Sequence, residues 1–159
     1  MEEHTNFAVL VREELIFLRV GGDAAAALRT VADALQEKGV VLPTYYEALM
    51  EREHEFPTGL PMGELNIAMP HTVPQHTLKK GVAIATLAKP ALFRCMGDAD
   101  STVQVQLLVF PLLDKMDDNV RLLPSLIHFF IKQENIRALL EAESPAQIMA
   151  ILRERAESA

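Results

Sequence analysis

The segment Val103-Gln-Val-Gln-Leu-Leu-Val-Phe-Pro-Leu-Leu113 is a dense apolar run, and it decides the fold class. The density of its apolar residues predicts a strand that is buried on both faces. Two shorter runs, Asn66–Met69 and Gly81–Leu87, are also typical of strands. Together the three segments predict a central sheet of mixed character.

Segments on both sides of these runs have the periodicity of helices. Asp23 is a suitable N-cap for a helix over Ala24–Lys38, and Gly39 ends it. Further helices are predicted from Pro43 or Thr44 to about His54, around Val120–Phe130, over Glu134–Glu141, and from Ser144 to about Glu154. Phe7–Val11 and Leu15–Val20 are predicted to be strands or an extended start. The chain is therefore predicted to be one α/β domain over residues 1–159, a small mixed central β-sheet flanked by helices.

Composition restricts the function classes. With 159 residues, 50% of them apolar, the chain can bury one sizeable core. The net charge of −7 disfavours nucleic acid as a partner and would steer a basic protein toward the surface. No apolar run approaches the roughly 20 residues that span a bilayer, and Met-Glu-Glu-His lacks the features of a signal peptide. We expect a cytoplasmic protein with no membrane insertion.

Common catalytic devices other than histidine find little support. The five histidines match no metal-ligand spacing, and one cysteine cannot complete a zinc site alone. The chain also lacks Gly-x-Ser-x-Gly and a phosphate-binding Gly-x-x-x-x-Gly-Lys. Cys95 is predicted to be an inert core residue. The sequence thus predicts neither a metal nor an organic cofactor.

His71 is the residue best placed for chemistry. It follows the short apolar run and Pro70, whose ring fixes its own φ and pushes Met69 toward extended geometry. The chain therefore reaches His71 with few conformations open to it. A neutral imidazole is both a base and a nucleophile near pH 7, because its ordinary pKa is about 6.5.

Three short motifs precede or contain this histidine: Arg52-Glu53, Pro57-Thr58-Gly59 and Ala68-Met69-Pro70-His71. In this combination the chain resembles the enzyme IIA domains of the bacterial phosphoenolpyruvate-dependent sugar phosphotransferase system, of the mannitol/fructose type. The resemblance extends over nearly the whole chain. The segment Glu55–Leu60, and His76 five positions after His71, are most similar to the galactitol-type IIA proteins.

The resemblance implies a phosphoryl relay. His71 would accept the group from the histidine-containing phosphocarrier protein and pass it to a cysteine of enzyme IIB, which serves the membrane enzyme IIC. Arg52 would clamp the phosphate oxygens, while Thr58 and Thr72 would offer hydroxyl hydrogen bonds. Mannitol-type members hold a second active-site histidine, for which Asn119 is the best match here. Whether His76 or Asn119 replaces it stays open.

Two alternatives retain the same residues but change the role. A regulatory IIA-like protein would use phosphorylation of His71 as a charge switch that alters docking to a transporter or transcription factor. A purely structural binding module would leave His71 inert. Neither the sugar nor the oligomeric state follows from the sequence.

Overall fold

The computed structural model describes residues 7–115 and 118–156, with the backbone alone for 118–120. It is an α/β structure with one sheet. The strands are β1 (Val11–Val20), β2 (Gly59–Leu60), β3 (Ile67–Ala68), β4 (Gly81–Cys95) and β5 (Asp98–Leu112). The α-helices are α1 (Ala24–Glu37), α2 (Tyr45–Glu55), α3 (Asp118–Phe130), α4 (Gln133–Glu141) and α5 (Pro145–Ala156).

The sheet mixes parallel and antiparallel pairs, as predicted. Its strand order is β1-β4-β2-β3-β5, and β4 and β5 also pair with each other as a long antiparallel hairpin. β1 runs parallel to β4, and β3 runs parallel to β5. The short strand β2 pairs antiparallel with β3 and parallel with the far end of β4. These two short strands bring the segments before Leu60 and after Ala68 to the same place.

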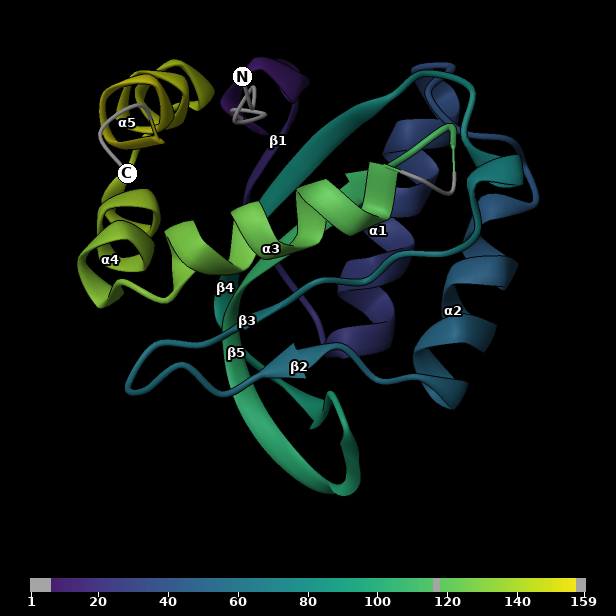
Figure 1. Cartoon of the computed structure of the whole chain (residues 1–159), viewed down its shortest axis with the longest axis horizontal. Coiled ribbons are helices and arrows are strands. Elements are labelled where there is room, and N and C mark those ends of the chain that lie inside the picture. The colour runs from purple at the N-terminus through teal and green to yellow at the C-terminus, as the bar shows by residue number, and fades with distance from the viewer. Residues whose placement is uncertain (1–6, 116–117, 157–159) are drawn as a thin grey trace.

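Helices cover both faces of the sheet, and each face has its own apolar core. Ile84 of β4 and Val109 of β5 point toward α3, α4 and α5, whereas Ala85 and Phe110 point toward α1 and α2. Figure 1 shows α1 and α2 together on one side, and α4 and α5 on the other. Alternate side chains of β4 and β5 are thus buried in opposite directions. The apolar run is buried on both faces from Leu107 to Leu113, as predicted, whereas Gln104 near its start is exposed.

The five predicted helices are confirmed, with ends within a few residues of the expected ones. Asp23 caps α1, since its side chain accepts a hydrogen bond from the Ala26 N–H at 2.9 Å. Ser144 acts in the same way at the start of α5, where its hydroxyl oxygen accepts from the Gln147 N–H at 3.2 Å. These starts were predictable because capping depends on residues that are adjacent in sequence.

The prediction of a strand over Phe7–Val11 is wrong for most of its length. Phe7–Leu10 form a 3₁₀ helix, and β1 begins only at Val11. Phe7 is buried among aromatic side chains of α3, with its ring centroid 5.2 Å from that of Phe129. Packing of one aromatic ring against α3 therefore prevailed over the β-propensity of the segment.

Two further strands differ from their predicted extents. β4 continues past Leu87 to Cys95, and β5 begins at Asp98, because Met96 and Gly97 form a tight turn with Gly97 at φ 79°. Pro90 is tolerated inside β4 because the β4–β5 register is irregular between Thr86 and Ala91. β2 was not predicted, since two residues are too few to show a period.

Candidate active site

His71 lies just beyond β3, whose position is fixed from two sides. β3 is buried between β2 and β5, with Ala68 opposite both Gly59 and Leu108. One residue further, the Met69 N–H donates to the Thr58 carbonyl oxygen at 3.2 Å. The chain therefore leaves the sheet at Met69 in a defined direction, and Pro70 restricts the next step to His71.

The imidazole of His71 is held by a backbone carbonyl. Its Nδ1 lies 2.8 Å from the Met69 carbonyl oxygen, and the residue is half-buried. A carbonyl oxygen can only accept a hydrogen bond, so Nδ1 carries the proton in this contact. In the neutral ring, Nε2 then carries the free lone pair. This contact leaves Nε2 as the ring nitrogen that could act as a nucleophile.

The surroundings of the ring also favour its neutral form. Burial lowers the pKa of His71, the Met69 carbonyl opposes that shift, and the positive charge of Arg52 lowers the pKa further. Burial disfavours the charged imidazolium because it removes the water that would solvate it. The lowered pKa favours the neutral imidazole, which is the form that can act as a nucleophile.

Arg52 lies in the last turn of α2, and its charge acts on His71. The guanidinium carbon lies 4.4 Å from the centroid of the Phe56 ring. Phe56 is itself exposed, so the stacked pair lies at the surface next to the His71 segment. Stacking restrains the planar guanidinium while leaving its N–H groups free to bind an anion.

Thr58 is buried and bonds to Glu53. Its N–H donates to Glu53 Oε2 at 2.9 Å, and its hydroxyl donates to Glu53 Oε1 at 2.6 Å. The single hydroxyl hydrogen is thus given to Glu53 in this structure. Donation from Thr58 to a phosphate stays a prediction. Sequence reasoning missed Glu53, although its place beside Arg52 in a recognised motif was a signal.

The structure separates His76 from Arg52. The His76 Nδ1 lies 2.8 Å from the Thr44 hydroxyl oxygen, at the start of α2. Thr44 and Arg52 are eight residues apart, which is about 12 Å along a helix axis. Thr72 is half-buried directly after His71. The side chain of Asn119, in the first turn of α3, lies outside the described residues.

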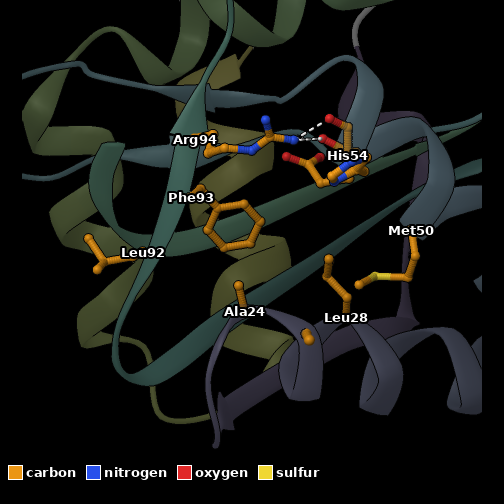
Figure 2. Close-up of a pocket in the computed structure, with 9 residues that line it drawn as sticks. Ala24, Leu28, Met50, His54, Leu92, Phe93 and Arg94 are labelled. Carbon is orange, nitrogen blue, oxygen red and sulfur yellow. Dashed lines mark hydrogen bonds between the residues drawn. The ribbon is translucent and has the colours of Figure 1, made fainter. Parts of the chain in front are cut away.

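A small cavity of about 240 Å³ lies between the start of α1, the end of α2 and β4. Its lining includes Leu28, Met50, Phe93 and Arg94, and Figure 2 shows the Arg94 guanidinium reaching the carbonyl groups at the end of α2. Arg94 donates to the carbonyl oxygens of His54 and, at 3.4 Å, Glu53. Arg94 therefore anchors the helix end that carries Arg52 and Glu53.

Within its described part, the chain has neither a metal-binding group of side chains nor a helix that could span a membrane. Over residues 7–115 and 118–156, no three His, Cys, Asp or Glu side chains are grouped so that they could hold a metal ion. In the same ranges, no helix has the length and apolarity needed to cross a membrane. Cys95 is a buried free cysteine, as predicted.

Relatives of known type match most of the chain. The mannitol-specific EIICBA component from Pasteurella multocida (strain Pm70) is 26% identical over 156 residues, 96% of this chain and 24% of that protein. The galactitol-specific EIIA component of Escherichia coli (strain K12) is 29% identical over 111 residues, 68% of this chain and 73% of that protein. The chain thus spans about a quarter of the mannitol relative.

Solved structures share the fold. The IIA mannitol protein of Escherichia coli superposes with a TM-score of 0.72 at 23% identity, covering 89% of this chain and 98% of that one. The same TM-score and identity relate the chain to the complex of enzyme IIA mannitol with phosphorylated enzyme IIB mannitol from Escherichia coli, covering 91% and 98%. These likenesses confirm the predicted mannitol-type IIA fold.

The family itself is shown by a match that covers almost all of the described residues. The model of the family described as "Phosphoenolpyruvate-dependent sugar phosphotransferase system, EIIA 2" matches residues 9–155. That range contains β3, His71, Arg52 and the turn between them. The chain therefore belongs to the EIIA 2 family of the phosphoenolpyruvate-dependent sugar phosphotransferase system.

Proposed function

We propose that this chain is a cytoplasmic phosphocarrier, in which His71 accepts a phosphoryl group from the histidine-containing phosphocarrier protein and gives it to a cysteine of enzyme IIB. One observation carries the proposal. The Nδ1 of His71 is bonded to the Met69 carbonyl at 2.8 Å, which leaves Nε2 as the free nucleophile on a half-buried ring near Arg52. Family membership supports the same role.

The transfer balances without a cofactor. The Nε2 lone pair forms a bond to phosphorus while the N–P bond of the donor phosphohistidine breaks and its electron pair returns to the donor ring. In the second step, the thiolate of enzyme IIB attacks phosphorus and the Nε2–P bond breaks. In both steps the proton stays on Nδ1, which keeps its hydrogen bond to the Met69 carbonyl oxygen. The same atom, Nε2, therefore accepts the phosphoryl group and releases it.

Arg52 supplies the charge that phosphoryl transfer requires. The transferred group carries negative charge on its three equatorial oxygens, and catalysis depends on placing and neutralising that charge. The guanidinium of Arg52, which lies over the Phe56 ring, offers two parallel donors to those oxygens. Thr72 directly follows His71 in the sequence, and its hydroxyl offers a further donor.

The relatives support the proposed enzyme IIB partner. A galactitol-specific EIIA component matches 68% of this chain, which supports an enzyme IIB of the galactitol type as acceptor. A mannitol-specific IIA protein of the same fold was solved in complex with its phosphorylated enzyme IIB. Enzyme IIC would then act on the sugar in the membrane, so this chain touches no sugar.

A reconstituted relay tests the proposal. The protein is incubated with phosphoenolpyruvate, enzyme I and the phosphocarrier protein, and acid-labile phosphate is located by mass spectrometry. We expect one phosphoryl group on His71 and its loss when galactitol-type enzyme IIB is added. Phosphate on another residue, or none, would contradict the proposal. Phosphate that stays on His71 with every enzyme IIB tested would favour the regulatory role instead.

A further inference from the structure

Glu53 has a bonding pattern that the transfer mechanism above does not use. Both of its carboxylate oxygens are turned toward one residue: Oε1 accepts from the Thr58 hydroxyl at 2.6 Å, and Oε2 from the Thr58 N–H at 2.9 Å. Glu53 is half-buried at the end of α2, and Thr58 is 2% exposed. Such a pair of bonds to a charged acceptor is among the strong hydrogen bonds in proteins.

The bonds continue from Thr58 to the ring of His71. The Thr58 carbonyl oxygen accepts from the Met69 N–H at 3.2 Å, and the Met69 carbonyl oxygen accepts from His71 Nδ1 at 2.8 Å. Glu53 is thus the first member of a series of hydrogen bonds that ends on the imidazole. A displacement of Thr58 would be passed to Met69, and from there to the carbonyl that holds Nδ1.

The position of Glu53 on α2 gives this series a purpose. Glu53 directly follows Arg52 in the last turn of α2. One helical turn therefore carries both Arg52, which would bind the phosphate, and Glu53, which holds Thr58. Arg94 anchors that turn by donating to the carbonyl oxygens of Glu53 and His54. Hydrogen bonds thus hold both the helix end that carries Arg52 and the segment that carries His71, and phosphoryl transfer requires its reacting groups to be held in place.

A direct chemical role for Glu53 does not fit its contacts. Its two oxygens face Thr58 and not the ring of His71, and a carboxylate facing the phosphoryl group would repel it. A carboxylate suits the observed contacts because it offers an acceptor to each of the two Thr58 donors. A glutamine offers only one acceptor atom, because its amide nitrogen donates.

We propose that Glu53 is a positioning residue, which acts through Thr58 and Met69 to hold the His71 ring in the Nδ1–H tautomer at a set distance from Arg52. This inference rests on the proposed phosphocarrier function. Glu53 touches neither the phosphoryl group nor the ring, and its effect is on geometry alone.

The test compares Glu53→Gln with Glu51→Gln, an exposed glutamate on the same helix. For each protein, the ¹⁵N shifts of the His71 ring report the tautomer, and quenched-flow measurements report the rate of phosphorylation by the phosphocarrier protein. We expect Glu53→Gln to slow phosphorylation by about tenfold to a hundredfold, the size of effect that a small misplacement of reacting groups produces. Its ring shifts should move toward a mixture of tautomers, while Glu51→Gln matches the wild type.

Thr58 variants test the route and protect against a variant that fails to fold. Thr58→Val removes the hydroxyl but keeps the N–H, and Thr58→Ser restores the hydroxyl. We expect Thr58→Val to slow phosphorylation about tenfold and Thr58→Ser to recover it to within about threefold. In the double variant Glu53→Gln/Thr58→Val the two losses should fall well short of multiplying, because the residues act through one another.

The outcomes separate this inference from the proposed function. Ring shifts and a phosphorylation rate that stay at wild-type values in Glu53→Gln would overturn the positioning role. A slower rate with unchanged ring shifts, or losses that multiply in the double variant, would overturn it as well. A wild-type protein that takes up no phosphate on His71 would instead refute the phosphocarrier function, while the ring shifts would still report on Glu53.

Discussion

His71 and His76 are five residues apart in the sequence, yet they interact with residues at opposite ends of α2. His71 lies near Arg52 in the last turn of the helix, and its Nδ1 is bonded to the Met69 backbone carbonyl. His76 lies at the first turn, with its Nδ1 bonded to the hydroxyl of Thr44. The same ring atom of the same residue type thus meets two different partners.

The difference between the two partners decides what each histidine can do. A carbonyl oxygen only accepts, so it forces the proton onto Nδ1 and leaves Nε2 free to attack. A hydroxyl both donates and accepts, so the Thr44 contact leaves the tautomer of His76 open. Arg52 adds positive charge at one end only. A nucleophilic histidine for phosphoryl transfer therefore needs its particular neighbours as well as an imidazole.

Replacing each histidine by glutamine is the strongest test of this contrast. We expect His71→Gln to lose phosphorylation entirely, because it lacks the attacking nitrogen, and His76→Gln to keep a rate within about twofold of the wild type. Mass spectrometry after incubation with the phosphocarrier protein measures both. A loss of a hundredfold or more in His76→Gln would mean that the two ends of α2 work as one site.

Removing the charge at the His71 end comes next in size. Arg52→Gln should slow phosphorylation by about a hundredfold, the usual cost of losing one donor to developing negative charge. Arg52→Lys keeps the charge but loses the planar fork and its stacking on Phe56, so it should recover only part of the rate. A full recovery with lysine would show that charge alone is required.

The close packing around Gly59 of β2 gives a prediction about stability. A Cβ on Gly59 would lie 2.7 Å from the Arg94 carbonyl oxygen and 3.1 Å from the Phe93 Cβ. Gly59→Ala should therefore lower the free energy of unfolding by about 1–3 kcal/mol, as overpacking commonly does. Gly21→Ala is the matched control, because nothing lies within 4 Å of its added Cβ. Urea unfolding compares the two variants, and equal stability would contradict the prediction.

The contact between His76 and the start of α2 should affect the stability of the protein but not the rate of phosphoryl transfer. Thr44→Val removes the hydrogen bond to His76 and should cost about 0.5–1.5 kcal/mol of unfolding free energy. The phosphorylation rate should stay at the wild-type value, and Thr44→Ser should restore the stability. A slower rate in Thr44→Val at unchanged stability would connect this end of α2 to the chemistry.

The smallest expected effect concerns pH. Burial lowers the pKa of His71, so between that pKa and the ordinary value of about 6.5 the unfolded chain binds more protons than the folded one. The contribution of His71 to stability is thus complete above about pH 6.5 and falls as the pH drops through the folded pKa. Unfolding of the wild type and His71→Gln between pH 5 and 8 measures it.

An NMR titration should also show a higher His71 pKa in Arg52→Gln, since a positive charge has been removed.

Features that depend on neighbouring residues were predictable from the sequence, whereas features that depend on contacts between distant residues were not. α1 and α5 were predictable, because Asp23 and Ser144 cap helices whose partners are three residues away. Phe7–Leu10 was not, because its conformation depends on an aromatic contact with α3, far along the chain. The site divides in the same way. Arg52 and His71 were named from their motifs, whereas the bonds between Glu53 and Thr58 were missed.

The sequence by itself determined the α/β class, the apolar core strands, the five helices and a stiffly held histidine after β3, because periodicity, capping and the restriction imposed by Pro70 act over a few residues. Only the tertiary structure decided that Nε2 is the ring nitrogen of His71 without a hydrogen bond to the Met69 carbonyl. It also decided that β2 pairs with the strand before His71, and that His76 contacts the start of α2. Those features depend on the pairing of Gly59 with Ala68 and on both ends of α2. Contacts of that kind join residues whose separation in sequence carries no pattern.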